Sequence, residues 1–301
     1  MEHIGERIRM IRNLRIWSLI FLLPGLALFI YIVVLPTIQV INSSMYNWSP
    51  GQVGTFVGLN NFTQMFADPS FRDALLHTFV LLIGAMIIQI PLGFIFAYLI
   101  FRRYIGSAFF QTVFFIPMVL SSVVIALLWT QVYNQDFGLL NSLLRAVGLG
   151  DLTRPWLGDS SSSLISVVVV VGWQYVGLYM LIFLAALQRI PHSIFEAAEI
   201  DGAVGVRQLK SITAPLVIDT LKLSVILVVT GAVQYFNLIW AMTQGGPANS
   251  SSVLASYMFI KGLQESRLGY AGAVATVMLV VNLILAIGLQ RVFRREPLEL
   301  G

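Results

Sequence analysis

The chain has 301 residues, of which 57% are hydrophobic and only 11% are charged, and it contains no cysteine. Soluble domains carry about 45–50% apolar and about 25% charged residues, so this composition excludes a soluble enzyme, and the missing cysteines exclude a disulfide-stabilised secreted scaffold. The formal net charge of +4 is small and requires no nucleic-acid partner.

Six long apolar stretches follow one another along the chain. Each is long enough, at about 1.5 Å per residue, to cross a hydrocarbon core of about 30 Å as an α-helix. The first is about twice as long as the apolar part of a signal peptide, so it is expected to be an uncleaved span. The sequence therefore predicts an all-α, polytopic membrane protein with six transmembrane helices. Their predicted ranges are 17–41, 75–101, 107–133, 164–187, 217–242 and 270–290.

Basic residues are divided unevenly between the loops. Twelve Lys or Arg residues lie in the N-terminal segment, the loops at 102–106 and 188–216, and the C-terminus, against five in the other loops. Because basic residues near span ends are retained on the cytoplasmic side, both termini are predicted to be cytoplasmic. The predicted organisation is a cytoplasmic segment at 1–16, a transmembrane domain at 17–290 and a cytoplasmic tail at 291–301.

The spans carry almost no ionised side chains. Asp219 and Lys222, one turn apart at the cytoplasmic start of the fifth span, are the exceptions. Ion-coupled carriers usually place charged or histidine residues at mid-depth, because these groups bind and release the driving ion. Amides and aromatic rings enter the fourth and fifth spans instead. Such amides either bond neighbouring helices together or line a pathway for an uncharged substrate.

The longest predicted cytoplasmic loop, at about 190–215, is built like two short helices. Ser193 and Glu196 have the spacing of a capping box, so the first helix is expected to start near Ile194. Gly202 is placed to take the left-handed conformation that ends this helix.

The second helix of the loop is expected to run from about Val204 towards Pro215, because the residue before a proline is biased out of the helical region. Three alanines, Ala197, Ala198 and Ala203, leave a thin surface that another protein can approach closely. The loop is therefore a candidate docking element, although any helical loop between spans has caps and alanines.

The same loop contains the pattern EAAxxDGA followed by a proline. Its residues are Glu196, Ala197, Ala198, Asp201, Gly202, Ala203 and Pro215. This pattern resembles the EAA loop of the membrane subunits of bacterial binding-protein-dependent ABC importers, in the form found in sugar permeases. The chain departs from the family at Ala214, where leucine is usual before the proline.

Further patches, in the expected order, resemble the maltose/lactose-type carbohydrate uptake permeases. They include Phe56 to Phe62, Phe236-Asn237, Thr243 to Pro247, and Gly269 to Ala271. His77 stands where this family usually has asparagine. The resemblance covers most of the chain and implies the type I ABC importer permease fold.

The resemblance also implies a division of labour between subunits. The EAA loop is the coupling helix that sits in a cleft of an ATP-binding cassette subunit, with Glu196 anchoring it, Gly202 supplying the turn and Asp201 capping the second helix. No GxxxxGK[ST] phosphate loop occurs in the chain, so ATP and Mg are expected on that partner, and the chain itself is expected to be non-catalytic and free of cofactors. The implied partners are a second, homologous permease, two ATP-binding cassette subunits, an extracytoplasmic sugar-binding protein and membrane lipid, in a bacterial inner membrane.

A substrate pathway follows from the resemblance by position. Permeases of this kind that bind sugar do so between the spans that flank the EAA loop. The residues on the fifth span have i, i+3, i+4, i+7 spacing and are expected to share one helical face. Amides and rings suit a neutral di- or oligosaccharide, because amides bond hydroxyls while rings stack on sugar C–H faces. The transferred positions are Gln174, Tyr175, Leu178, Val228, Gly231, Ala232 and Tyr235.

The two longer external loops, at about 42–74 and 134–163, are implied to receive the binding protein. The stretch from Leu139 to Leu149 is amphipathic and is expected to form a helix on the outer membrane interface.

Three alternatives remain open. Glycerol phosphate or another polyol is the alternative substrate of an ABC permease, and a phosphorylated one should need a basic residue in the path. An ion-coupled secondary carrier is disfavoured by the uncharged spans. An intramembrane enzyme is disfavoured because His3, His77 and His192 are widely dispersed. The sequence does not indicate which sugar is carried.

Overall fold

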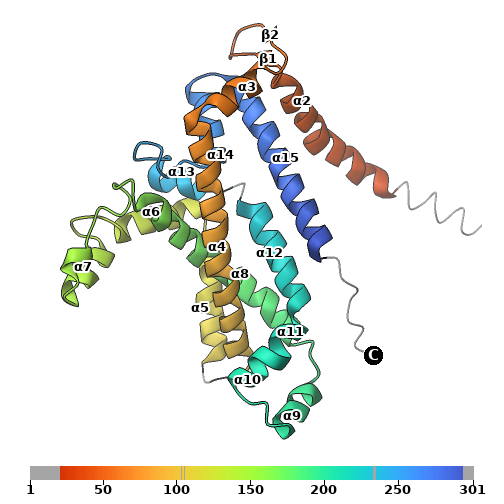
Figure 1. The fold of residues 1–301 in the computed structure, drawn as a ribbon, viewed down its shortest axis with the longest axis vertical. Helices are drawn as coiled ribbons and strands as arrows, with labels where there is room; N and C mark the ends of the chain where they lie inside the picture. Colours follow the sequence, from red (N-terminus) through yellow and green to blue (C-terminus); the bar gives the residue numbers. More distant parts are fainter. Residues whose placement is uncertain (1–20, 103, 105, 233–234, 294–301) are drawn as a thin grey trace, which may run out of the picture. The chain divides into compact units, whose positions relative to one another are not determined.

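The computed structural model describes residues 21–102, 104, 106–232 and 235–293. The predicted cytoplasmic segment at 1–16 and positions 294–301 of the predicted tail lie outside the described residues. The described chain is mostly helical (Figure 1). Its α-helices are α2 (Leu35–Ser43), α3 (Asn60–Ala67), α4 (Pro69–Phe101), α5 (Ser107–Val119), α6 (Ser122–Val132), α7 (Leu139–Ala146), α8 (Ser163–Leu187), α9 (His192–Ile200), α10 (Val206–Gln208), α11 (Ala214–Leu216), α12 (Ile218–Ala232), α13 (Asn237–Thr243), α14 (Leu254–Phe259) and α15 (Leu268–Phe293).

Shorter elements complete the chain. Three are π-helical, one is 3₁₀-helical, and two strands of two residues pair antiparallel. They are η1 (Ile30–Val34), η3 (Leu209–Thr213), η4 (Ile260–Gln264), η2 (Gly150–Leu152), β1 (Tyr46–Asn47) and β2 (Thr55–Phe56).

Four helices of the described residues are long and apolar enough to cross a membrane. They are Phe21–Ser43, Pro69–Phe101, Ser163–Leu187 and Leu268–Phe293. Two helix pairs pass the same test together, but they bend by 104° and 70° at a short break. These pairs are Ser107–Val119 with Ser122–Val132, and Val206–Leu216 with Ile218–Gly231. With each pair taken as one span the total is six, and the predicted all-α, polytopic fold class is confirmed.

The third span is bent where the sequence predicted one helix over 107–133. Leu120 leaves the helical region with φ −73° and ψ 148°, and Ser121 then caps α6, its hydroxyl oxygen accepting a hydrogen bond from the Val123 N–H at 3.3 Å. Pro117 lies one turn before the break. Hydropathy alone does not detect such a break, because the residues on both sides are apolar.

The fifth span also differs from its prediction as one helix over 217–242. The helix α12 ends at Ala232, and α13 begins at Asn237 after Phe236, which has φ −120° and ψ −54°. Leu238, Ile239 and Met242 of α13 are buried, and α13 packs against α6 and α8. Tertiary packing of this short helix therefore overrides the continuous apolar pattern.

The described chain divides into two compact units. One comprises the described part of Met1–Met65 together with Lys261–Thr276. Within it, the buried Asn61 donates from Nδ2 to the carbonyl oxygens of Ser44 at 2.8 Å and Tyr46 at 2.9 Å. The Gly269 N–H donates to the Trp48 carbonyl at 3.2 Å, so the start of α15 is tied to the strand segment.

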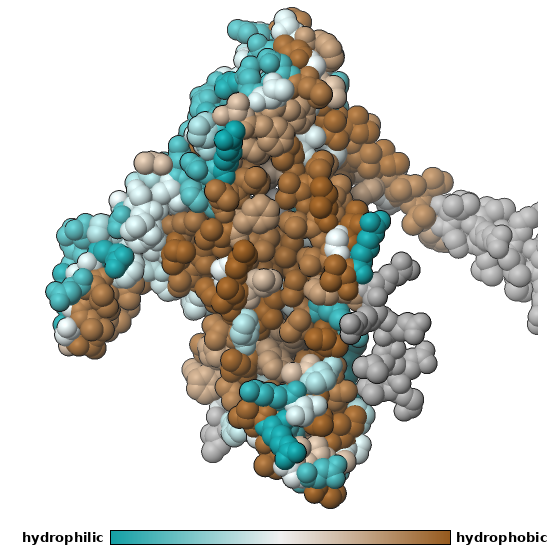
Figure 2. Space-filling model, viewed as in Figure 1, coloured by the Kyte–Doolittle hydropathy of each residue, from teal (hydrophilic) through white to brown (hydrophobic). Residues whose placement is uncertain are grey.

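The second unit comprises Phe66–Ile260 and the described part of Val277–Gly301, and its centre is the packing of α4 against α8. Three glycines permit this contact: a Cβ at Gly84 would lie 2.4 Å from Val168, one at Gly93 2.8 Å from Tyr179, and one at Gly172 2.6 Å from Ile88. Small residues let helices approach closely where lipid removes the hydrophobic drive to associate. Figure 2 shows a hydrophobic surface along α4 and α5, as expected for helices that face lipid or another membrane subunit.

Candidate functional site: a docking loop and a polar cluster between the spans

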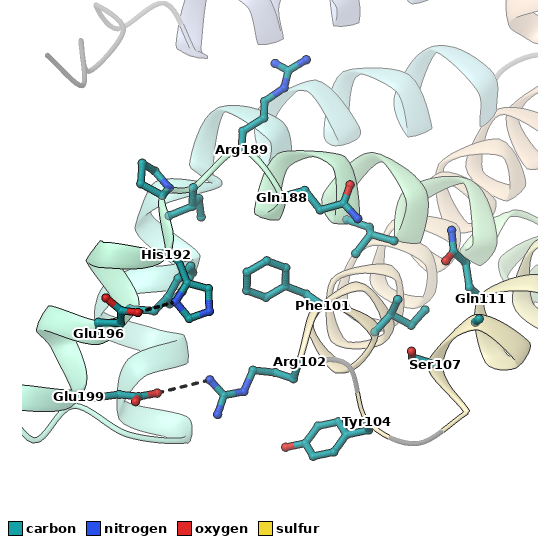
Figure 3. Close-up of a pocket in the computed structure, with 16 residues that line it drawn as sticks. Phe101, Arg102, Tyr104, Ser107, Gln111, Gln188, Arg189, His192, Glu196 and Glu199 are labelled. Atoms are coloured by element: carbon teal, nitrogen blue, oxygen red, sulfur yellow. Dashed lines mark ion pairs between the residues drawn. The ribbon is translucent and has the colours of Figure 1, made fainter.

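The first helix of the loop at 190–215 begins earlier than predicted. Its cap is Pro191, without a side-chain hydrogen bond, so the capping box of Ser193 and Glu196 does not form. Glu196 instead faces back along α9, with its Oε1 atom 3.3 Å from Nδ1 of His192 (Figure 3). Both side chains are exposed, His192 by 83% and Glu196 by 67%.

The two alanines after Glu196 lie in different environments. Ala197 is exposed beside it, whereas Ala198 is buried, as is Phe195. The Phe195 ring packs against Phe101 at the end of α4, with ring centroids 5.4 Å apart. Glu196 and Ala197 therefore lie on the exposed surface of α9, while Phe195 and Ala198 face the rest of the unit.

The end of α9 is a Schellman turn. Gly202 has φ +74°, its N–H donates to the Glu199 carbonyl at 3.1 Å, and the Ala203 N–H donates to the Ala198 carbonyl at 2.8 Å. The predicted left-handed glycine is confirmed. Asp201 occupies the last half-helical position of α9 and does not cap the second helix, whose cap is Gly205, so that expectation was wrong.

The second helical segment continues through the proline. It runs over α10, η3 and α11, and Ala214 stays helical with φ −63° and ψ −43°. The exposed Pro215 lies inside α11, and the 70° bend comes after it, at Val217. The segment therefore ends slightly later than predicted. The π-helical turn η3 lies immediately before α11. Such turns accommodate an irregular pattern of backbone hydrogen bonds.

A cavity of about 1010 Å³ lies between α9 and the ends of α4, α5 and α8. Arg102 reaches across it, with Nη1 3.7 Å from Oε1 of Glu199 (Figure 3). It also donates to Oε1 of the buried Gln208 at 3.3 Å. Neither Arg102 nor Gln208 was singled out from the sequence. The available signals were a basic residue directly after a span and an amide inside an otherwise exposed loop.

The predicted pathway residues of the fourth and fifth spans meet only in part. The rings of Tyr175 and Tyr235 pack 5.5 Å apart, and a Cβ at Gly231 would lie 3.7 Å from the Tyr235 hydroxyl. However, Tyr235 lies beyond the end of α12 at Ala232, so the predicted single helical face is wrong for this residue. Tyr235 contacts Tyr175 from a non-helical position after the end of α12.

Two buried amides accompany these rings. Gln174 is 2% exposed and donates from Nε2 to the Ser122 hydroxyl at 3.2 Å, and the fully buried Gln89 donates to the Val171 carbonyl at 3.1 Å. Among the described residues, Oε1 of each amide has no hydrogen-bond partner. Gln89, which lies beside Tyr235, was not assigned to the pathway from the sequence, although it is an amide in the middle of an apolar span.

The loop at 134–163, which was predicted to be external, is held by polar contacts. The buried Asn141 donates from Nδ2 to the carbonyls of Gln135 and Arg154, both at 3.1 Å, and accepts from the Trp156 indole at 2.8 Å. Hydrogen bonds from the backbone N–H and hydroxyl of Ser161 lower the pKa of Asp159. In Figure 2, hydrophobic residues gather on one side of α7 in this loop, consistent with the predicted amphipathic helix.

Metal-ligand geometry is missing from the described part of the chain. Nowhere among these residues do three or more His, Cys, Asp or Glu side chains come together as a metal site would require.

Comparison with solved structures shows that the fold is shared with a known chain. The crystal structure of a bacterial alginate ABC transporter, in complex with an alginate-bound periplasmic protein, contains a chain that superposes with a TM-score of 0.82 at 22% identity. The match covers 93% of this chain and 95% of that chain.

Comparison of sequences gives closer relatives. The diacetylchitobiose uptake system permease protein NgcF of Streptomyces coelicolor is 33% identical, covering 89% of this chain and 79% of the relative. The multiple sugar-binding transport system permease protein MsmF of Streptococcus mutans is 31% identical, covering 91% and 93%. Residues 89–296, well over half of the chain, match the family described as binding-protein-dependent transport system inner membrane component. The chain therefore belongs to this family and is a permease subunit of an ABC transporter.

Proposed function

We propose that this chain forms half of the translocation pathway of an ATP-driven importer for a neutral di- or oligosaccharide. The observation that carries the proposal is α9, a short helix between two spans that exposes Glu196 and Ala197 and ends at the left-handed Gly202. The names of NgcF and MsmF support the substrate class, since both describe sugar transport.

In this proposal the loop at 190–215 docks on an ATP-binding cassette subunit. The carboxylate of Glu196 bonds a basic group of that subunit, and the small Ala197 lets the partner surface approach the helix. The Schellman turn sets the direction of the second helical segment. The proposed coupling residues are Glu196, Ala197, Ala198, Asp201, Gly202, Ala203 and Pro215.

The remaining subunits supply what this chain lacks. Two ATP-binding cassette subunits bind ATP and Mg, a second permease completes the pathway, and an extracytoplasmic binding protein selects the sugar. The complex lies in a bacterial inner membrane, with both termini of this chain in the cytoplasm because its basic loops are retained there.

The proposed substrate pathway follows α8 and the end of α12. Its polar groups are the amide of Gln174 and the hydroxyls of Tyr175 and Tyr235, and the two tyrosine rings offer faces for sugar C–H groups. Gly231 and Ala232 contribute positions without long side chains. Within the described part of the chain the Gln174 Oε1 atom has no hydrogen-bond partner, which supports this assignment, because a buried acceptor without a donor is costly unless a ligand supplies one.

Reconstitution tests the proposed class. The chain and its co-expressed partner subunits are placed in proteoliposomes, and uptake of radiolabelled maltotriose, diacetylchitobiose and glycerol 3-phosphate is measured with and without ATP. We expect uptake of an oligosaccharide that requires both ATP and the binding protein, and a complex with a hydrolysis-deficient ATPase subunit serves as the control.

Other results of this experiment would change the proposal. Uptake of glycerol 3-phosphate alone would support the alternative substrate within the same family. Uptake by vesicles that contain only this chain, driven by an ion gradient, would contradict an ATP-driven importer.

A further inference from the structure

The end of α4 contacts the docking loop through a charged side chain. Arg102 is the residue directly after α4, and its guanidinium lies 3.7 Å from the Glu199 carboxylate of α9. The same Nη1 atom donates to Oε1 of Gln208 in α10 at 3.3 Å. In Figure 3 the Arg102 side chain extends across the cavity towards Glu199, while Arg189 points away from it.

Gln208 connects the two helical segments of the loop. It is 1% exposed, and its Nε2 atom donates to the Phe195 carbonyl of α9 at 3.4 Å. The backbone carbonyl of Gln208 accepts a hydrogen bond from the Thr213 hydroxyl at 3.3 Å. Both polar ends of the Gln208 side-chain amide are hydrogen-bonded, Nε2 to α9 and Oε1 to Arg102. Arg102 therefore contacts a residue that belongs to the second segment and is bonded to the first.

An apolar contact lies beside these bonds. The Phe101 and Phe195 rings pack at 5.4 Å, and Phe195 is only 4% exposed. The loop is joined covalently to α8 and α12, but these side chains join it to α4 as well. The contact is therefore a third connection between the docking loop and the spans.

We propose that Arg102 is a positioning residue that passes the displacement of the docking loop to α4. This inference rests on the proposed function, in which the ATP-binding cassette subunit moves that loop. The Arg102 and Glu199 side chains are 37% and 50% exposed, so their pairing adds little to static stability. Loss of Arg102 therefore affects the transfer of motion more than folding.

The first test compares two arginines on the rim of the same cavity. Arg102→Gln and Arg189→Gln remove the same charge, but among the described residues Arg189 has no ion pair. In proteoliposomes with all partner subunits, the measured quantity is maltotriose or diacetylchitobiose taken up per ATP hydrolysed, with whichever sugar the wild-type complex imports.

Arg102→Gln is expected to lower this ratio at least about fivefold, with the ATPase subunit still co-purifying, and Arg189→Gln to stay within about twofold. An equal loss in both variants, or a wild-type ratio in Arg102→Gln, would overturn the proposal.

The second test restores the connection chemically. The chain contains no cysteine, so Arg102→Cys with Glu199→Cys introduces a unique pair that a short bismaleimide can bridge in a complex with cysteine-free partners. The unbridged double variant should show the low ratio, and bridging should raise it at least about threefold. A ratio that stays low after confirmed bridging contradicts the proposal.

A third variant separates this inference from the proposed function. Glu196→Lys removes the proposed docking contact. If Glu196→Lys abolishes uptake while Arg102→Gln keeps the wild-type ratio, only the role of Arg102 fails. If Glu196→Lys transports normally, the proposed docking of the loop fails.

Discussion

Glu196 and His192 lie one turn apart on the exposed side of α9, and their contact adds little to stability because both side chains face water. The exposed Glu196 carboxylate is therefore free to serve the proposed contact with a partner subunit. Its position was predictable from the EAA pattern. Its partner within the chain was not, because the expected capping box would have turned it towards Ser193 instead.

Substitution of Glu196 by lysine is expected to lower ATP-dependent uptake about tenfold or more, because it places a like charge against a basic group of the ATPase subunit. Uptake and co-purification of that subunit are the measurements. His192→Ala is the matched control, since it removes only the exposed contact within α9. A similar loss in His192→Ala would show that the charge pair inside the helix matters, and not docking.

Gln174→Leu separates a structural amide from a pathway amide. An unpartnered buried carbonyl oxygen costs about 1–3 kcal/mol, so leucine is expected to maintain or raise the melting temperature of the complex. If Gln174 contacts sugar, the same change raises the KM for uptake severalfold. Gln131→Leu, on an exposed amide of α6, is the control. An unchanged KM in Gln174→Leu would assign the residue to packing alone.

At the scale of elements, the positions of the helices were largely predictable and their breaks were not. Apolar runs identify spans because lipid requires about 20 consecutive apolar residues. The break after Leu120 and the departure of Tyr235 from α12 depend on tertiary contacts, such as the packing of α13 on α6, that leave no mark on hydropathy. For the same reason the pathway residues were placed on one face, although the chain brings Tyr235 to Tyr175 outside the helix.

The turn at Gly202 gives a prediction about backbone conformation. A Cβ at this position meets nothing within 4 Å, so substitutions act only through the φ of +74°. Asparagine tolerates the left-handed region, whereas a β-branched residue does not. Gly202→Asn is therefore expected to keep most of the uptake, and Gly202→Val to lose at least about fivefold as α9 and the following segment change direction. Equal uptake in both variants would show that the turn is not needed.

At the scale of the whole molecule, the absence of cysteine allows the orientation to be measured. Tyr104→Cys lies in a loop predicted to be cytoplasmic, and Val53→Cys in one predicted to be external; their parent side chains are 60% and 95% exposed. In intact spheroplasts, a membrane-impermeant maleimide should label Val53→Cys and reach Tyr104→Cys only after lysis. The reverse pattern would invert the topology and place the docking loop on the wrong side for ATP.

The glycine contacts between α4 and α8 have a mechanical consequence. At three levels a glycine of one helix lies directly against a residue of the other, so the two helices cannot slide or separate without opening empty space and move as one rigid pair. Bending is easier where helical hydrogen bonding is interrupted, as at the 104° bend in the third span and the 70° bend before α12. A displacement of the docking loop would then rotate the α4–α8 pair as a unit about these two bends. Little of the motion would be lost to deformation of the two helices.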